Sequence, residues 1–157
     1  MRPGGRIVGL GEPAAGDDGV GIAVLDWLRE RGVPAGIALA EVRDASDLLP
    51  LLESPGRVVL VDAAIGGAPG RVVELAPAEL DCSHLLPLST HGVGVAQMIA
   101  LAALLAPDRL APSIRIVAIT IAKPRTYLKA LSAAVNAAVP RAAACAVELA
   151  ASTDDTG

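Results

Sequence analysis

The chain has 157 residues, of which 53% are hydrophobic and 19% are charged, and its formal net charge is −4. This length and composition predict one domain with its own hydrophobic core and exclude an intrinsically disordered chain. The negative charge and the aromatic content of 1% argue against binding of nucleic acid through a basic surface or through base stacking.

Strand-like and helix-like segments alternate along the chain. Short β-branched runs predict strands at 6–10, 37–42, 57–62, 71–75 and 113–121. Apolar residues at helical spacing predict helices at 18–31, 93–105 and 128–151, together with a short helical piece at 47–53. We expect Pro50 to interrupt the short piece and Pro140 to break the last helix.

This alternation predicts a three-layer α/β/α sandwich, with helices on both faces of a mixed, mainly parallel five-stranded sheet. Only a glycine turn separates the third and fourth strands, so we expect one antiparallel neighbour there. Residues 1–151 are expected to form a single α/β domain. The polar residues 152–157 are expected to be a disordered tail.

The apolar segments give no indication of export or of membrane insertion. The first apolar run is about five residues long, too short for a signal peptide. No stretch free of Pro and charge reaches the roughly 18–20 residues that span a bilayer. We therefore expect a cytoplasmic protein without membrane insertion, in which Cys82 and Cys145 are reduced.

Polar side chains follow the predicted strands at their carboxyl ends, where open α/β sheets bind ligands. The loop after the first strand carries Glu12, Asp17 and Asp18, and the third strand ends at Asp62. His91 comes just before the long apolar helix. Two carboxylates and an imidazole suit a divalent metal ion that keeps positions open for another ligand.

Each of these residues also has a structural explanation. Asp17 and Asp18 could cap the helix that follows them, and Asp62 could hold a neighbouring loop. His91 could cap its own helix or be exposed. A dinucleotide site fits poorly, because GLGEPAAG is not GxGxxG and paired aspartates would repel a pyrophosphate. Spacing alone leaves the metal site and the structural explanations open.

Three motifs together resemble the hydrogenase maturation protease family. GLGEPAAGDDGVG (9–21) is similar to the family's N-terminal signature, GxGNxxxGDDGxG in general form. VDAAIGGAPGRVVEL (61–75) is similar to the second motif, in which an Asp closes a strand and a G-x-PG turn follows. STHGVGVAQMIALA (89–102) is similar to the third, a Ser/His pair that opens a helix. The motifs occur in the family's order, and the resemblance covers about residues 5–140.

The resemblance implies an endopeptidase that removes a short C-terminal extension from the precursor of a [NiFe]-hydrogenase large subunit after nickel has been loaded. The family's metal ligands fall on Asp18, Asp62 and His91, which would also be the catalytic residues. Asp17 is a further candidate for activating water. We expect the nickel to be shared with or supplied by the precursor, and other divalent cations to occupy the site in vitro.

Two features of the sequence bear on substrate binding. Glycines surround the candidate ligands and would let a second backbone approach closely, so Gly16, Gly66 and Gly67 are expected to contact substrate. Glu12 replaces the Asn that is usual in the signature and is expected to contact substrate or to change the local charge.

A third feature is a departure from the family. ITIAKPRTYL (119–128) stands where the family commonly has a Gln-Pro-Glu-like element, which leaves the substrate contacts of Lys123 and Arg125 open.

The sequence offers little support for other kinds of peptidase. Ser89 and Cys82 are available as nucleophiles, but no Ser/His/Asp or Cys/His arrangement is evident. There is no HExxH motif of the zinc metalloproteases. The alternative to an enzyme is a nickel-sensing chaperone that binds the same precursor without cutting it.

Overall fold

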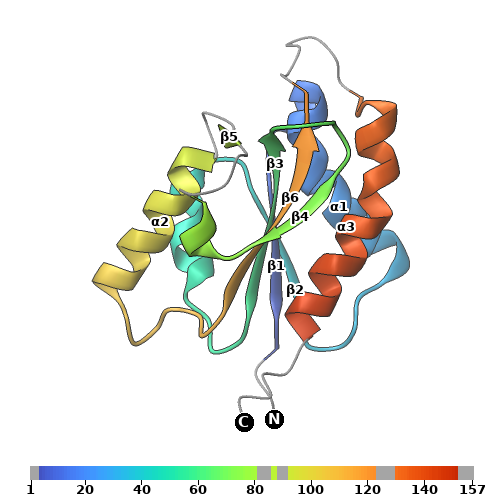
Figure 1. Ribbon diagram of the computed structural model, residues 1–157. Coiled ribbons are helices and arrows are strands. Elements are labelled where there is room, and N and C mark those ends of the chain that lie inside the picture. The colour runs from blue at the N-terminus through green and yellow to red at the C-terminus, as the bar shows by residue number, and fades with distance from the viewer. Residues whose placement is uncertain (1–3, 81–85, 88–91, 123–129, 152–157) are drawn as a thin grey trace.

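A mixed β-sheet lies at the centre of the structure, with helices against both of its faces (Figure 1). This computed structural model describes residues 4–80, 86–87, 92–122 and 130–151. The strands are β1 (Arg6–Leu10), β2 (Ala38–Val42), β3 (Val58–Ile65), β4 (Val72–Leu75), β5 (Leu86–Pro87) and β6 (Ile114–Ile121). The helices are α1 (Val20–Arg31), α2 (Gly92–Leu105) and α3 (Ala133–Ala151), with 3₁₀ segments η1 (Pro13–Gly19), η2 (Ala45–Leu52) and η3 (Pro77–Glu79).

The sheet confirms the predicted α/β/α sandwich and its mainly parallel pairing. Its strand order is β2-β1-β3-β6-β4, and the two-residue β5 pairs with the end of β3. The five predicted strands all form. The antiparallel strand β4 is also found, but its partner is β6, not the expected β3. The glycine turn therefore carries the chain past β6, whose hydrogen bonds to β3 fill the place that a hairpin would need.

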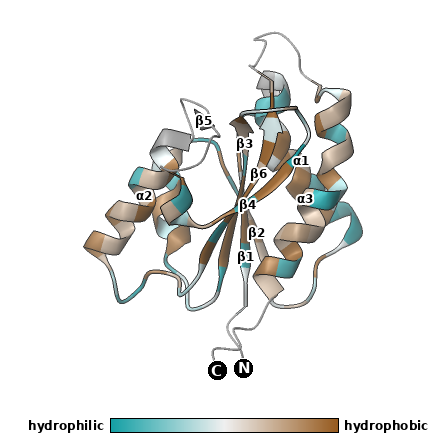
Figure 2. Ribbon diagram, viewed as in Figure 1, coloured by the Kyte–Doolittle hydropathy of each residue, from teal (hydrophilic) through white to brown (hydrophobic). Residues whose placement is uncertain are grey.

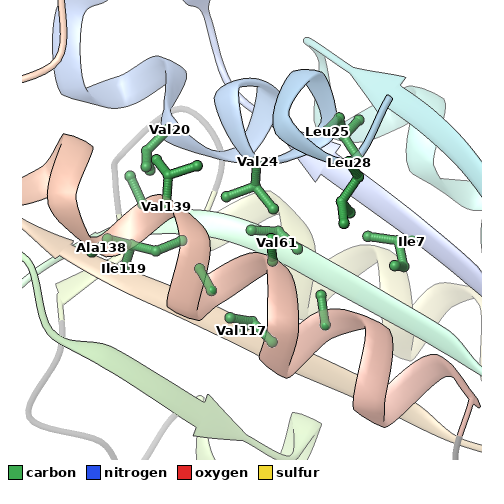
Figure 3. Packing of buried hydrophobic residues seen from close by; sticks show 14 of the residues in the cluster. Ile7, Val20, Val24, Leu25, Leu28, Val61, Val117, Ile119, Ala138 and Val139 are labelled. Carbon is green, nitrogen blue, oxygen red and sulfur yellow. The ribbon is translucent and has the colours of Figure 1, made fainter. Parts of the chain in front are cut away.

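Alternation along β3 divides the core into two layers. Val59, Val61 and Ala63 pack with α1 and α3 on one face of the sheet (Figure 3). Val58 and Leu60, on the opposite face, belong to the cluster that α2 and η2 cover. Figure 2 shows the apolar residues concentrated along these central strands. Because both faces of β3 are buried, the strand is a nearly continuous run of apolar residues, as parallel strands usually are.

Glycines allow α1 to lie very close to the ends of β1 and β3. A Cβ on Gly21 would stand 2.4 Å from the carbonyl oxygens of both Leu10 and Val61. A Cβ on Gly9 would stand 2.5 Å from the carbonyl oxygen of Gly21. No side chain fits at either contact, so the first turn of α1 rests directly on the backbone of the two strands.

The last helix differs from its prediction at Pro140. The proline lies inside α3, which continues unbroken to Ala151. Pro140 is exposed, so the carbonyl that loses its intrahelical partner, that of Asn136, can be hydrated on the outer side. The opposite side of α3 is held against the sheet and α1 by its buried residues, Val135, Ala138, Val139, Ala142, Ala143, Ala146 and Ala150.

Length and hydropathy alone would also allow α3 to cross a membrane, and within the described ranges it is the one helix of which this is true. Its packing accounts for the same apolar composition in another way. The buried residues lie along one side and belong to the core that α1 and the sheet share. We therefore interpret α3 as a core helix.

Replacing Gly21 with Ala tests the contact between α1 and the sheet. On an open helix surface this change stabilises by about 1 kcal/mol, but here the methyl group would meet two backbone oxygens. We expect the free energy of unfolding, measured in urea, to fall by about 1–3 kcal/mol, as in other overpacked cores. As a control, Ala144→Gly makes the reverse change on the exposed side of α3, where it measures the difference in helix propensity between Ala and Gly alone. A gain of stability for Gly21→Ala would contradict the contact.

Candidate functional site

Asp62 lies within β3, not at its end as expected, because the strand continues to Ile65. The neighbouring strand β1 is shorter, and its last residue paired with β3 is Gly9, opposite Val61. On the other side, Asp62 pairs with Ala118 of β6. Asp62 is therefore the first residue of β3 after its last pair with β1. It still lies at the carboxyl edge of the sheet, where the sequence placed it.

The side chain of Asp62 is buried, with 7% of its surface exposed. The alternation of β3 turns it to the same face as Leu60 and Ala64, the face that α2 covers. Its Oδ1 accepts a hydrogen bond of 2.8 Å from the backbone N–H of Ala63. Helix α2 contacts β5 and begins at Gly92, directly after His91, which itself lies outside the described residues.

Asp18 is the second buried carboxylate of this edge, with 6% of its surface exposed. It belongs to η1, which contacts β3, and its Oδ2 accepts a hydrogen bond of 3.3 Å from the backbone N–H of Glu12. The N-cap of α1 is Gly19, which makes no side-chain capping bond. Asp18 is therefore not the N-cap residue of α1, which starts two residues later than predicted.

Asp17 does cap a helix, but a distant one. Its Oδ1 accepts a hydrogen bond of 2.6 Å from the backbone N–H of Ser132, the residue that precedes α3. The sequence suggested capping of the helix that follows Asp17, because only nearby positions can be compared without a structure. A partner 115 residues further along leaves no local signal.

Thr120 holds the glycine-rich loop that follows β3, and the sequence analysis did not single it out. Its side chain is fully buried, and its hydroxyl donates to the carbonyl of Ala68 at 2.7 Å and accepts from the N–H of Arg71 at 2.8 Å. The backbone of Thr120 also bonds to Gly70 and Arg71. A polar residue in an otherwise apolar strand, IRIVAITI, was the available signal.

The loop at 66–70 has a backbone that needs glycine. Gly67 and Gly70 have φ values of +64° and +88°. A Cβ on Gly70 would stand 2.6 Å from the carbonyl oxygen of Ala134, so the loop also packs against the first turn of α3. Gly66 is half-buried and Gly67 is exposed at this edge of the molecule.

The structure thus brings some of the predicted residues to one edge and leaves others undescribed. Asp17, Asp18, half-buried Glu12 and buried Gly16 belong to the loop after β1, and Gly66 and Gly67 to the loop after β3. Within the described ranges, no three His, Cys, Asp or Glu side chains form a group that could hold a metal ion. The remaining residues that the sequence raised lie outside the described ranges: Cys82, Ser89, His91, Lys123, Arg125 and the tail 152–157.

Cys145 is not suited to act as a nucleophile. It is a free, half-buried cysteine on α3, and burial, followed by the charges of Glu74 and Glu148, raises the pKa of its thiol. A raised pKa lowers the thiolate fraction at neutral pH, and the thiolate is the reactive form.

The comparisons with known proteins agree on one family. Residues 43–149, about two thirds of the chain, match a family profile described as hydrogenase maturation protease. This range includes Asp62 and His91 but not Asp17 or Asp18. A sequence comparison with curated proteins finds no match.

Solved structures with the same fold extend the similarity to nearly the whole chain. The [NiFe] hydrogenase maturation protease HybD from Thermococcus kodakarensis is 26% identical, with a TM-score of 0.75 over 92% of this chain and 97% of that one. The hydrogenase maturating endopeptidase HybD from E. coli is 17% identical, with a TM-score of 0.74 over 89% of this chain and 87% of that one. At 17% identity, the similarity to the E. coli protein supports a common fold and nothing more.

Replacing Thr120 with Val tests how the 66–70 loop is held. The shape is kept, but the N–H of Arg71 and the carbonyl of Ala68 lose their side-chain partner. We expect a loss of about 1–3 kcal/mol in the free energy of unfolding, with faster hydrogen exchange at the Arg71 amide. Thr120→Ser keeps the hydroxyl and should cost about 0.8 kcal/mol for one methyl group. If Val and Ser behave alike, the hydroxyl does not hold the loop.

Proposed function

The chain belongs to the hydrogenase maturation protease family, and we propose that it removes the C-terminal extension from a nickel-loaded large-subunit precursor of a [NiFe] hydrogenase. The observation that carries this proposal is the pair of buried carboxylates, Asp18 and Asp62, at one edge of the sheet. Asp18 lies in η1, which follows β1, and Asp62 lies within β3, the parallel neighbour of β1.

The nickel of the precursor is, in this proposal, part of the substrate. Asp18, Asp62 and His91 bind it from the side of the protease. Carboxylate oxygens and an imidazole nitrogen are suitable ligands for a divalent ion such as nickel. Burial of two carboxylates at one edge is costly unless positive charge or hydrogen bonds compensate it. A divalent cation supplies that charge, which supports a site that is complete only when the precursor is bound.

Binding the nickel also explains how the cleavage site is chosen. An ion held by the precursor and by three protease residues fixes the position of the scissile peptide relative to the sheet edge. Such positioning makes the attack of water effectively intramolecular. Water adds to the peptide carbonyl carbon, a carboxylate of the edge accepts its proton, and the proton passes to the leaving amine as the C–N bond breaks.

The two glycine-containing loops are the proposed platform for the extended precursor chain. Gly66 and Gly67 lie in a loop that Thr120 holds in place, so their backbone groups are accessible to a peptide without a side chain between them. Glu12 and Gly16 are placed on the other side of the platform, in the loop after β1. The protein is proposed to act in the cytoplasm, where nickel loading precedes cleavage.

Mass spectrometry of the nickel-loaded precursor after incubation with the protein tests this function. We expect loss of a short C-terminal peptide, and no loss from nickel-free precursor. Asp18→Asn, Asp62→Asn and His91→Ala should each lower the cleavage rate by about 100-fold or more, since each removes a nickel ligand that positions the bond. The asparagines retain an acceptor for the N–H groups of Glu12 and Ala63, so both variants should fold.

Asp26→Asn is the matched control, because Asp26 lies exposed on α1 and pairs with Arg29. It should cleave at the wild-type rate. A stable complex with an uncut precursor, obtained with every hydrogenase precursor of the same organism, would show the nickel-sensing chaperone instead. Cleavage at wild-type rates by all three ligand variants would contradict the proposed site.

A further inference from the structure

We propose that Asp17 is a positioning residue, not the base that activates water, and that it places Asp18 by tying η1 to the start of α3. The consequence for cleavage rests on the proposed function, whereas the placement of Asp18 can be tested without it. The observations are the hydrogen bonds that Asp17 and Asp18, adjacent residues of η1, make with two different segments.

The bond between Asp17 and Ser132 has the character of a helix cap. Oδ1 of Asp17 accepts the N–H of Ser132 at 2.6 Å, and the carbonyl of Ser132 accepts from Asn136 as the first turn of α3 begins. Ser132 thus stands at the N-terminus of α3, where backbone N–H groups are left without intrahelical partners. A carboxylate at this end is favoured by the helix dipole, and a charge-assisted hydrogen bond is stronger than a neutral one.

The start of α3 is a firm point of attachment. Val135 and Val139 in its first two turns are buried against the core. Ala134 packs against the backbone of Gly70, where no side chain fits. A loop that is tied to this turn is therefore tied to the packed body of the domain.

The loop that carries Asp18 gains a second attachment from this bond, beside the hydrogen bond from the N–H of Gly11 to the carbonyl of Val42 in β2. Residues Gly11 and Gly16 have φ values of +149° and +62°, conformations that glycine adopts at little cost. The hydrogen bond between Asp18 and Glu12 lies within this same loop, so it shapes the loop but does not attach it to another element. The bond to Ser132 attaches η1 to an element 115 residues away. Asp18 follows Asp17 directly, so fixing one limits the movement of the other.

The two possible roles of Asp17 make opposite demands on its side chain. A general base must accept a proton, which a carboxylate can do and an amide cannot. A positioning residue needs only an oxygen that accepts the N–H of Ser132, which Asn supplies as well as Asp. Ala supplies neither a proton acceptor nor an oxygen that can bond to Ser132. Asp17→Asn and Asp17→Ala therefore separate the two roles.

The first experiment measures amide hydrogen exchange by NMR in the unliganded protein. In Asp17→Ala we expect exchange at Ser132 to become at least about tenfold faster, because its acceptor is lost. The amide of Glu12, which bonds to Asp18, should accelerate too if Asp18 is no longer held. Asp17→Asn should leave both amides as in the wild type. Acceleration at Ser132 with an unchanged Glu12 amide would overturn the proposal.

The second experiment measures precursor cleavage. We expect Asp17→Asn to stay within about threefold of the wild-type rate and Asp17→Ala to lose about 10–100-fold, as small misplacements of reacting groups do. Ser132→Pro removes the same N–H from the other side, and its effect should not add to that of Asp17→Ala. Loss of cleavage in Asp17→Asn as large as in Asp18→Asn would overturn the proposal. If the wild type does not cleave the precursor, the proposed function fails, and the exchange data still decide the role of Asp17.

Discussion

The site depends on the direct contact between the first turn of α1 and the backbone of β1 and β3. A side chain at Gly21 would collide with the carbonyl oxygens of Leu10 and Val61, so the helix can approach only because that position has no Cβ. The loop between β1 and α1 is then confined to the space directly above the strand ends. Gly11 makes the same kind of contact, since a Cβ there would stand 2.2 Å from the carbonyl oxygen of Asp18. The backbone of Asp18 is thereby brought down to the edge of the sheet.

The strand β3 is longer than β1, and this places a carboxylate close to the contact between α1 and the two strands. The pairing of β3 with β1 ends at Val61, and Asp62 is the residue that follows. At this edge η1 contacts β3, the strand that carries Asp62. Two acidic side chains can be buried here because backbone N–H groups bond to both of them. Asp62, one of the proposed metal ligands, lies on a strand, and sites built on strands and helices are more precise than sites built on loops.

Local patterns in the sequence were sufficient for the five longer strands, the three helices and the carboxyl edge of the sheet, but not for β5, η1 or η3. The β-branched runs identified five strands, and the acidic residues after the first and third pointed to their carboxyl ends. Local patterns could not show which distant segments pair or bond with one another. The partner of β4 depends on β6 inserting beside β3, about 40 residues later, and the helix that Asp17 caps lies further still. Thr120 could be noticed as a polar residue in an apolar strand, but its partners in the 66–70 loop could not be named.

These distant contacts also determine at which stage of folding the candidate site can form. Asp17, from the loop after β1, bonds to the residue before α3, and Gly70, from the loop after β3, packs against the first turn of α3. Both loops are therefore attached to the last helix of the domain. A chain that lacked a docked α3 would lose the point to which both loops are attached. Contacts between residues so far apart form only after the entropy of closing the long intervening segments has been overcome. Formation of the candidate site is therefore coupled to completion of the whole fold.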